Sequence, residues 1–311
     1  MSTASIRIVT RTSRLAMWQA EHIRSRLMAH HPTLDISIIG IKTKGDLWLQ
    51  TPLQKIGGKG LFVKELEEAL LANEADIAVH SLKDLPSSFP ESLGLAAICE
   101  RENPLDAWIC PQGYTLATLP SGSIVGTSSL RRTVQLRYFR PDLEYRPLRG
   151  NVDTRLRKCF DGEWDAIVLA AAGLKRLDLF AHVTEVFSAE QVLPAVGQGA
   201  LAIETRLDDE RTRAWLSVLD DKNTRACVNA ERAMNAALGG NCQVPVAGFA
   251  VIKNGQLHLT GRVGHPNQHA LLEAAASGDI EQAVTVGHHV ADNLIEQGAK
   301  KLIADILNHD S

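Results

Sequence analysis

The sequence predicts a mixed α/β fold in which two α/β lobes are followed by a smaller α+β module. Three observations support this prediction. Short β-rich runs alternate with helical patterns, which is typical of parallel sheets covered by helices. The alternation restarts after the polar stretch Glu100–Pro104, a candidate hinge. From about Lys222 the pattern changes to a long helix followed by two strands.

The first lobe is predicted from five elements. Apolar runs indicate strands at Ser5–Thr10, Asp35–Ile41 and Asp76–His80, the last of them buried. Helices are expected at Arg14–His30 and Leu61–Ala72. The first of these helices places apolar residues near one face, as a helix that covers a sheet requires: Leu15, Trp18, Ile23 and Leu27.

The second lobe repeats this pattern. Strands are expected at Ser123–Gly126, Leu143–Leu148 and Asp165–Ala170, with helices near Ser129–Phe139, Val152–Phe160 and Ala171–Leu177. A second crossing near Leu193–Gly199 would return the chain to the first lobe, just before the apolar strand Ala200–Glu204. The predicted domains are therefore 1–99 with 200–218, then 105–193, and finally 222–311.

The third domain is predicted to be α+β. A helix from Lys222 to Leu238 precedes two strands, Val244–Val251 and Gln256–Val263. Asn254-Gly255 between the strands is a strong hairpin signal, because a tight hairpin turn needs positive φ at both central residues. Helices near Ile280–Glu296 and Lys300–Leu307 close the chain.

Composition argues against several classes of protein. No run approaches the ~18 apolar residues that a membrane span requires. Three arginines, Arg7, Arg11 and Arg14, interrupt the N-terminal segment, so it lacks the apolar core of a secretory signal. The cysteines are odd in number and form no C-x-x-C pair: Cys99, Cys110, Cys159, Cys227 and Cys242. We therefore expect a cytoplasmic protein without a disulfide framework or a metal site.

The charge distribution predicts an anionic ligand. Between Gly126 and Lys158 nine Arg and Lys residues stand against three Asp and Glu residues, which gives +6 in a chain with a net charge of -3. Nucleic acid would fit this sign. However, aromatic residues make up only 5% of the chain and no nucleic-acid motif frames the cluster, so we expect no nucleic-acid partner.

Basic and hydroxyl side chains follow four of the predicted strands. The carboxyl ends of strands in an open α/β sheet face the ligand crevice, and a helix that begins there presents free N–H groups to an anion. Each motif alone could also have a purely structural role, such as an ordinary N-cap or a surface ion pair. Together they predict a cleft for a polyanion: Arg11-Thr12-Ser13, His80-Ser81-Leu82-Lys83-Asp84, Gly126-Thr127-Ser128-Ser129-Leu130-Arg131-Arg132 and Arg149-Gly150-Asn151.

Two loops remain open to two interpretations each. The basic, glycine-rich segment from Lys55 to Gly60, which includes Lys59, is either a mobile lid or a simple flexible connection. Cys242 lies at a predicted loop tip, where a lone cysteine is more often a small buried hydrophobe than a reactive thiol. The neighbouring glycines and Asn241 would, however, let a ligand approach the backbone closely.

Taken together, the motifs resemble the hydroxymethylbilane synthase (porphobilinogen deaminase) family over nearly the whole chain. Six segments in order carry the resemblance: GGKGLFVKE at 57–65, VHSLKDLP at 79–86, VGTSSLRR at 125–132, LRGNVDTR at 148–155, LPAVGQG at 193–199 and AERAMNAALGGNCQVP at 230–245. The resemblance implies two doubly wound lobes like those of periplasmic binding proteins and a small C-terminal α+β domain.

The resemblance also implies an activity. Members of the family are transferases that join four porphobilinogen molecules head to tail onto a dipyrromethane cofactor, each with loss of ammonia. Hydrolysis then releases linear hydroxymethylbilane for porphyrin and haem biosynthesis. Every pyrrole carries an acetate and a propionate, so the growing chain is a polyanion. We therefore expect porphobilinogen as the small-molecule partner of a monomeric protein with no membrane partner.

Site residues follow from the same resemblance. Cys242 would hold the cofactor through a thioether, and Asp84 matches the catalytic carboxylate. Both half-reactions create positive charge on a pyrrole, and a nearby carboxylate can stabilise that charge and move protons. The remaining cofactor contacts would come from Ser81, Lys83, Thr127, Ser128, Ser129, Arg131, Arg132, Gly150, Asn151 and Arg155. Arg11, Ser13, Gln19, Arg149, Arg176 and Gln198 would contact substrate, and Lys55 and Lys59 would belong to the lid loop.

Two positions depart from the family pattern. Asn241 precedes the cysteine where a second small residue is expected, and Arg14 adds a charge beside Ser13. Asn tolerates a left-handed backbone, so the loop is expected to survive. A rival class, the non-catalytic two-lobed binding protein for a small anion, would share the lobes. It would normally carry a secretion signal, and it has no use for a loop cysteine.

Overall fold

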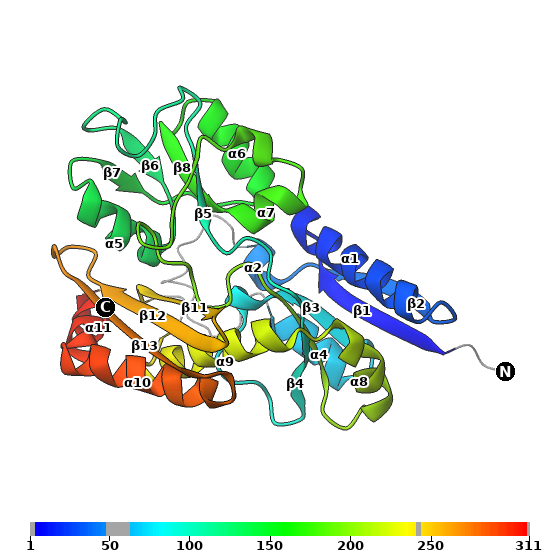
Figure 1. Cartoon of the computed structure of the whole chain (residues 1–311). Helices are drawn as coiled ribbons and strands as arrows, with labels where there is room; N and C mark the ends of the chain where they lie inside the picture. The colour runs from blue at the N-terminus through cyan, green and yellow to red at the C-terminus, as the bar shows by residue number, and fades with distance from the viewer. Residues whose placement is uncertain (1–3, 48–62, 241–243, 310–311) are drawn as a thin grey trace.

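Three sheets organise the residues that the structure, a computed structural model, describes: 4–47, 63–240 and 244–309 (Figure 1). Two sheets have five strands each, in the orders β2-β1-β3-β10-β4 and β7-β6-β8-β5-β9. The third has three strands, in the order β11-β12-β13. No helix in the described ranges is long and apolar enough to cross a membrane.

The first sheet is covered by helices on both faces. Its elements are β1 (Ser5–Arg11), α1 (Arg14–His30), β2 (Asp35–Ile41), α2 (Lys44–Leu47), α4 (Lys64–Leu71), β3 (Ile77–Ser81), the 3-10 turn η1 (Leu82–Asp84), β4 (Leu93–Ile98), β10 (Leu201–Arg206) and α8 (Glu210–Leu216). Ile23 of α1 packs on Ile8 and Val79, while Leu70 of α4 packs on Val9 and Ala78. Because neighbouring strand residues alternate between faces, these two contacts lie on opposite sides of the sheet.

The second sheet has the same construction. It contains β5 (Asp106–Ile109), β6 (Ile124–Gly126), α5 (Leu130–Phe139), β7 (Glu144–Arg146), α6 (Val152–Phe160), β8 (Ala166–Ala170), α7 (Ala171–Arg176), the 3-10 turn η2 (Phe180–His182) and β9 (Glu185–Val186). Leu136 of α5 packs with Val168, whereas Leu156 of α6 packs with Ile167. Adjacent residues of β8 thus enter two separate cores, one on each face.

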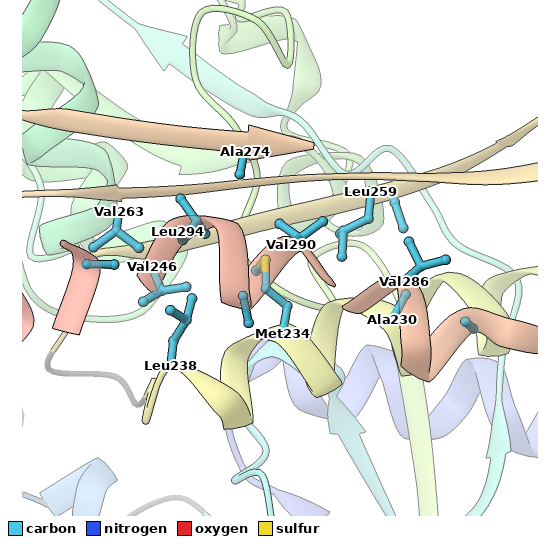
Figure 2. Close-up of a cluster of buried hydrophobic side chains, with 14 of the residues drawn as sticks. Ala230, Met234, Leu238, Val246, Leu259, Val263, Ala274, Val286, Val290 and Leu294 are labelled. Carbon is cyan, nitrogen blue, oxygen red and sulfur yellow. The ribbon is translucent and has the colours of Figure 1, made fainter. Parts of the chain in front are cut away.

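The third unit is an antiparallel sheet against two helices. Its elements are α9 (Lys222–Ala237), β11 (Val246–Lys253), β12 (Gln256–Gly264), β13 (Leu271–Asp279), α10 (Ala283–Glu296) and α11 (Ala299–His309). Figure 2 shows Met234 of α9 between α10 and the sheet, among Leu259, Val290 and Leu294. The β11–β12 turn has φ of 52° at Asn254 and 78° at Gly255, as its sequence predicts.

The expected alternation is confirmed, but the expectation of parallel sheets is wrong in part. β10 runs antiparallel to β3 and β4, and β5 runs antiparallel to β8 and β9. Each of these strands follows a crossing between the lobes instead of a covering helix, so no right-handed crossover fixes its direction. The chain does return to the first sheet at β10. The domain boundaries 1–99 with 200–218, 105–193 and 222–311 stay a prediction.

Glu231 of α9 ties the two crossings to the third unit. Its fully buried carboxylate accepts hydrogen bonds from Arg101 at 2.8 and 3.1 Å, from Gly197 N at 2.7 Å and from Ala250 N at 2.9 Å. Arg101 lies in the first crossing, Gly197 in the second and Ala250 on β11. One carboxylate therefore fixes three segments that are distant in the sequence.

Candidate active site

The strand ends of the first sheet enclose a cavity of about 60 Å³. Five residues singled out from the sequence contribute to its wall: Arg11, Ser13, Gln19, Ser81 and Asp84. The Ser13 hydroxyl caps α1 by accepting from Ala16 N at 3.3 Å. The buried amide of Gln19 donates to Ser81 Oγ at 2.8 Å. The exposed carboxylate of Asp84 lies on η1, directly after β3.

Arg11 of this cavity is held by a carboxylate that the sequence analysis missed. Its guanidinium forms an ion pair with Asp46 of α2, and the Thr43 hydroxyl donates to the same carboxylate at 2.9 Å. Burial alone would raise the pKa of Asp46, but Arg11 and Thr43 outweigh burial and lower that pKa. No motif marks Asp46, because its partner lies 35 positions earlier.

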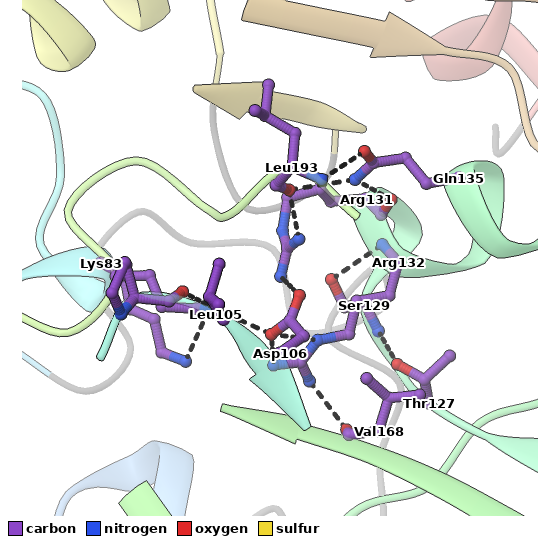
Figure 3. Close-up of polar contacts among 12 residues, drawn as sticks. Lys83, Leu105, Asp106, Thr127, Ser129, Arg131, Arg132, Gln135, Val168 and Leu193 are labelled. Atoms are coloured by element: carbon purple, nitrogen blue, oxygen red, sulfur yellow. Dashed lines mark hydrogen bonds and ion pairs between the residues drawn. The ribbon is translucent and has the colours of Figure 1, made fainter. Parts of the chain in front are cut away.

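The adjacent arginines of α5 converge on one buried carboxylate (Figure 3). Asp106 Oδ2 accepts from Arg131 Nη2 at 2.7 Å, and Oδ1 accepts from Arg132 Nη2 at 2.7 Å and Nε at 3.1 Å. Both guanidiniums also donate to main-chain oxygens, Arg131 to Leu193 and Arg132 to Val168. Burial opposes ionisation of Asp106, but the two guanidiniums have the larger effect and hold the pKa of Asp106 far below the ordinary value.

Gln198 and Lys83 extend this network to the first lobe. The Gln198 amide donates to Asp106 Oδ1 at 2.9 Å and to Pro104 O at 2.6 Å. Its oxygen accepts from Lys83 Nζ at 3.2 Å. Burial, reinforced by the charge of Arg132, lowers the pKa of Lys83 to about 8. The Lys83-Asp84 turn of one lobe is thus connected by hydrogen bonds to the arginines of the other.

The positive charge of this site exceeds its negative charge. Burial is also the main cause that lowers the pKa of Arg155, to about 10, with further contributions from the charges of Arg132 and Arg149. The negative charge of Asp84 acts in the opposite direction and raises the pKa of both Lys83 and Arg155. Four cations (Lys83, Arg131, Arg132 and Arg155) against two carboxylates (Asp84 and Asp106) leave a net charge of +2. Because buried charge is costly unless it is paired, this cluster is suited to a bound anion.

The hydroxyls at the start of α5 have local partners. Ser129 Oγ caps the helix by accepting from Arg132 N at 3.4 Å, and Thr127 Oγ1 accepts from Ser129 N at 3.2 Å. Ser128 Oγ donates to Leu148 O at 2.9 Å, at the end of the segment that leads to Arg149. These contacts fix the turn that presents Arg131 and Arg132.

A second turn of this kind lies at the start of α6. Gly150 has a φ of 116°, and a Cβ there would lie 2.9 Å from Thr154 Cγ2, so the position requires glycine. Its carbonyl accepts from Arg155 Nε at 2.7 Å. Asn151 is the exposed N-cap residue of α6 and makes no side-chain capping bond. Arg149 is half-buried, and burial lowers its pKa.

Two further basic residues lie where the lobes meet. Arg176 donates to Gly199 O at 2.7 Å, and its guanidinium lies 6.0 Å from the Trp18 ring centroid. Arg14 pairs with Asp153 of α6 at 2.6 Å, and it donates to Leu177 O at 3.2 Å. The extra charge of Arg14 is therefore used in a contact between α1 and the second lobe.

Some predicted residues lie outside the described ranges. They are Lys55 and Lys59 of the lid loop, together with Asn241 and Cys242. Within those ranges no group of three or more His, Cys, Asp or Glu residues could hold a metal ion.

Comparison with known proteins gives consistent matches. The family model for the porphobilinogen deaminase dipyromethane cofactor binding domain matches residues 6–214, and the model for the porphobilinogen deaminase C-terminal domain matches 225–296. A porphobilinogen deaminase from Chromobacterium violaceum is 54% identical over 300 residues, which cover 96% of this chain and 97% of that protein.

Solved structures of binding proteins match the chain at low identity and with TM-scores below 0.5. The methionine binding protein MetQ is 13% identical with a TM-score of 0.47, over 70% of this chain and 90% of that one. The periplasmic aliphatic sulphonate binding protein SsuA from Escherichia coli is 14% identical with a TM-score of 0.40, over 76% of this chain and 71% of that one.

Proposed function

The chain belongs to the porphobilinogen deaminase family, and we propose that Cys242, Asp84 and the basic residues described above carry out the activity of that family in this protein. The activity is that of a hydroxymethylbilane synthase, a transferase of porphyrin and haem biosynthesis. It joins four porphobilinogen molecules with loss of ammonia and releases the linear product by hydrolysis.

The buried positive cluster is the observation that carries this proposal. Each pyrrole of a dipyrromethane bears an acetate and a propionate, so the cofactor carries four negative charges, opposite in sign to the net charge of +2 at the site. Lys83, Arg131, Arg132 and Arg155 would hold its carboxylates, with contacts from Ser81, Thr127, Ser128, Ser129, Gly150 and Asn151, and Cys242 would hold it covalently. When bound, the cofactor supplies the terminal pyrrole ring to which the first substrate is joined.

Asp84 is the proposed catalytic residue. It follows β3 on η1, and its exposed carboxylate contributes to the wall of the cavity. As ammonia leaves porphobilinogen, positive charge develops on the pyrrole, and a carboxylate held nearby stabilises it. The same carboxylate can exchange a proton with the amino group that leaves.

The incoming substrate is assigned to the cavity. Arg11 would bind a substrate carboxylate, because Asp46 behind it holds the guanidinium in place. Ser13, Gln19 and Ser81 would add neutral polar contacts. Arg149 and Arg176, together with Gln198, would hold the growing chain between the lobes.

The remaining assignments are also part of the proposal. We assign the protein to the cytoplasm as a monomer, without nucleic-acid or membrane partners. The three domain boundaries predicted from the sequence and the lid role of Lys55 and Lys59 belong to the same proposal.

Intact-mass measurement tests the attachment site. The purified protein should exceed its sequence mass by two pyrrole units, and Cys242→Ser should show the sequence mass alone, because a hydroxyl is a much weaker nucleophile than a thiolate. Cys227→Ser is the matched control: Cys227 is buried in α9 of the same unit, and its variant should keep the added mass. A Cys242→Ser protein that still carries the two pyrrole units would contradict the assignment.

A further inference from the structure

A buried histidine–glutamate pair adjoins the cavity and has no part in the function proposed so far. His80 Nε2 lies 3.0 Å from Glu204 Oε2, and the two side chains are 5% and 0% exposed. The pair joins β3 to β10 on one face of the sheet, since Glu204 lies opposite Ala78 and His80 follows two residues later. Its position is therefore fixed by strand register.

Within the described ranges, His80 is the side chain that hydrogen-bonds to Glu204. The second carboxylate oxygen, Oε1, is buried without a hydrogen-bond partner. On the covering helix α4, Glu67 has a pKa that is raised by burial and then by the charge of Glu204, with His80 acting in the opposite direction.

His80 also borders the site. His80 contributes to the cavity wall together with Arg11, Ser81 and Asp84. An ionised Glu204 only accepts hydrogen bonds, so a neutral His80 paired with it would donate through Nε2 and keep its lone pair on Nδ1. Nδ1 makes no hydrogen bond in the described part of the chain and is not among its fully enclosed unpaired atoms.

A base whose far nitrogen is oriented by a buried carboxylate is the arrangement of a general base in acyl-transfer enzymes. We propose that His80 accepts the proton released at each coupling and that Glu204 is its positioning residue. This assignment rests on the proposed function. A bond forms between the aminomethyl carbon of porphobilinogen and the free α-carbon of the terminal pyrrole. The carbon–nitrogen bond breaks and ammonia leaves with the electron pair. The α-carbon then loses its proton, which passes to His80 Nδ1 and later to solvent.

The decisive experiment uses porphobilinogen deuterated at the free α-carbon. His80→Gln should lower kcat by ~100-fold, the usual contribution of a general base, with KM close to that of the parent. The isotope effect on kcat should rise above that of the parent, because proton removal becomes slower than the other steps. Glu204→Gln should lower kcat by about 10-fold or more, since the amide can donate to Nε2 and move the ring proton to Nδ1.

Asp76→Asn is the matched control. Asp76 immediately precedes β3 at its opposite end and pairs with Arg7 and Arg206, so its loss should affect stability without changing the isotope effect. A folded, cofactor-loaded His80→Gln enzyme with the kcat of the parent would overturn the proposal. A raised KM with unchanged kcat would also overturn it, because His80 would then hold substrate.

If the variants fail to fold, ¹⁵N NMR of the histidine ring in the parent protein can still test the proposal, because it shows which ring nitrogen of His80 carries the proton. The proposal requires the ring proton on Nε2, and a proton found on Nδ1 instead would refute it. A parent protein without the mass of the two pyrrole units would contradict the proposed function and with it this role of His80. A parent that carries the two units but has the ring proton on Nδ1 would refute the His80 assignment alone.

Discussion

Asp106→Asn tests whether the two arginines of α5 share their charge with the cofactor. In the structure Asp106 is fully buried and is the carboxylate on which both Arg131 and Arg132 converge. Removing one partner of a buried ion pair costs about 3–5 kcal/mol, because the other charge stays buried and unpaired. The asparagine oxygen can still accept one hydrogen bond, so we expect the lower end, about 3 kcal/mol.

The loss should depend on the cofactor. In the Cys242→Ser background, without dipyrromethane, the arginines have no bound carboxylate to replace Asp106, and the full loss is expected. In the loaded protein the cofactor carboxylates neutralise part of the same charge, so the loss should be smaller. The free energy of unfolding in urea is measured for the parent, Asp106→Asn, Cys242→Ser and the double variant. The difference between the two losses caused by Asp106→Asn is the coupling energy between Asp106 and the cofactor.

Asp76→Asn supplies the control for this cycle. Asp76 also pairs with two arginines, but its side chain is 15% exposed and it precedes β3 in the first lobe, away from the buried arginines of α5. Its loss should be the same in both backgrounds. If Asp106→Asn also lost the same amount in both, Arg131 and Arg132 would be structural residues only, and their assignment to the cofactor would fail.

The pH dependence of stability gives the same test a second readout. The two guanidiniums hold the folded pKa of Asp106 far below its unfolded value of about 3.9, in spite of burial. A depressed pKa stabilises the fold above the unfolded value, and this contribution is lost as the pH falls below it. The stability difference between the parent and Asp106→Asn should therefore shrink from pH 5 to pH 3. A difference that stays constant over that range would contradict the ionised state of Asp106.

Three further predictions concern the site. Asp84→Asn should lower turnover by at least ~100-fold while intact mass shows the cofactor retained; near-normal turnover would rule Asp84 out. Arg149→Leu and Arg176→Leu should keep the cofactor but stall with one or more substrates attached after brief exposure to porphobilinogen, and a ladder of masses like that of the parent would exclude both. Because burial lowers the pKa of Lys83 to about 8, the cofactor-free fold binds fewer protons than the unfolded chain between about pH 8 and 10.4. Its stability should rise over that window relative to Lys83→Met, and a parallel pH profile would refute the burial of that charge.

The fold was predictable where one helix face or one buried strand is encoded locally. Of the predicted apolar face of α1, Ile23 and Leu27 are buried, whereas Leu15 and Trp18 are only half-buried. The apolar run of β3 leads to the observed buried strand. Four strands, β4, β5, β9 and β13, were missed. β5 and β9 are only four and two residues long, and β13 reads LLEAAASGD, in which alanines favour no strand pattern. Their existence depends on pairing with strands that are distant in the sequence.

The site divides in the same way. Arg11, Lys83, Asp84, Arg131 and Arg132 were predictable because each follows a strand, and strand ends meet at one edge of a sheet. Their partners Asp46 and Asp106 were not, because a carboxylate in the sequence looks the same whether it faces water or an arginine. Asp106 begins the short run DAWI and meets Arg131 only through the pairing of β5 with β8.

The choice between an anion site and an ordinary basic surface therefore depends on how the charges are paired in the fold. The excess charge of +6 between Gly126 and Lys158 would not indicate an anion site if each arginine faced solvent, because salt and water would screen those charges. Other arginines of the segment are paired locally at the surface, as Arg146 is with Glu144. Arg131 and Arg132 are instead buried against a single carboxylate, with Lys83 added from the other lobe. The unpaired remainder of that buried charge, and not the total along the sequence, is what an anionic cofactor would neutralise.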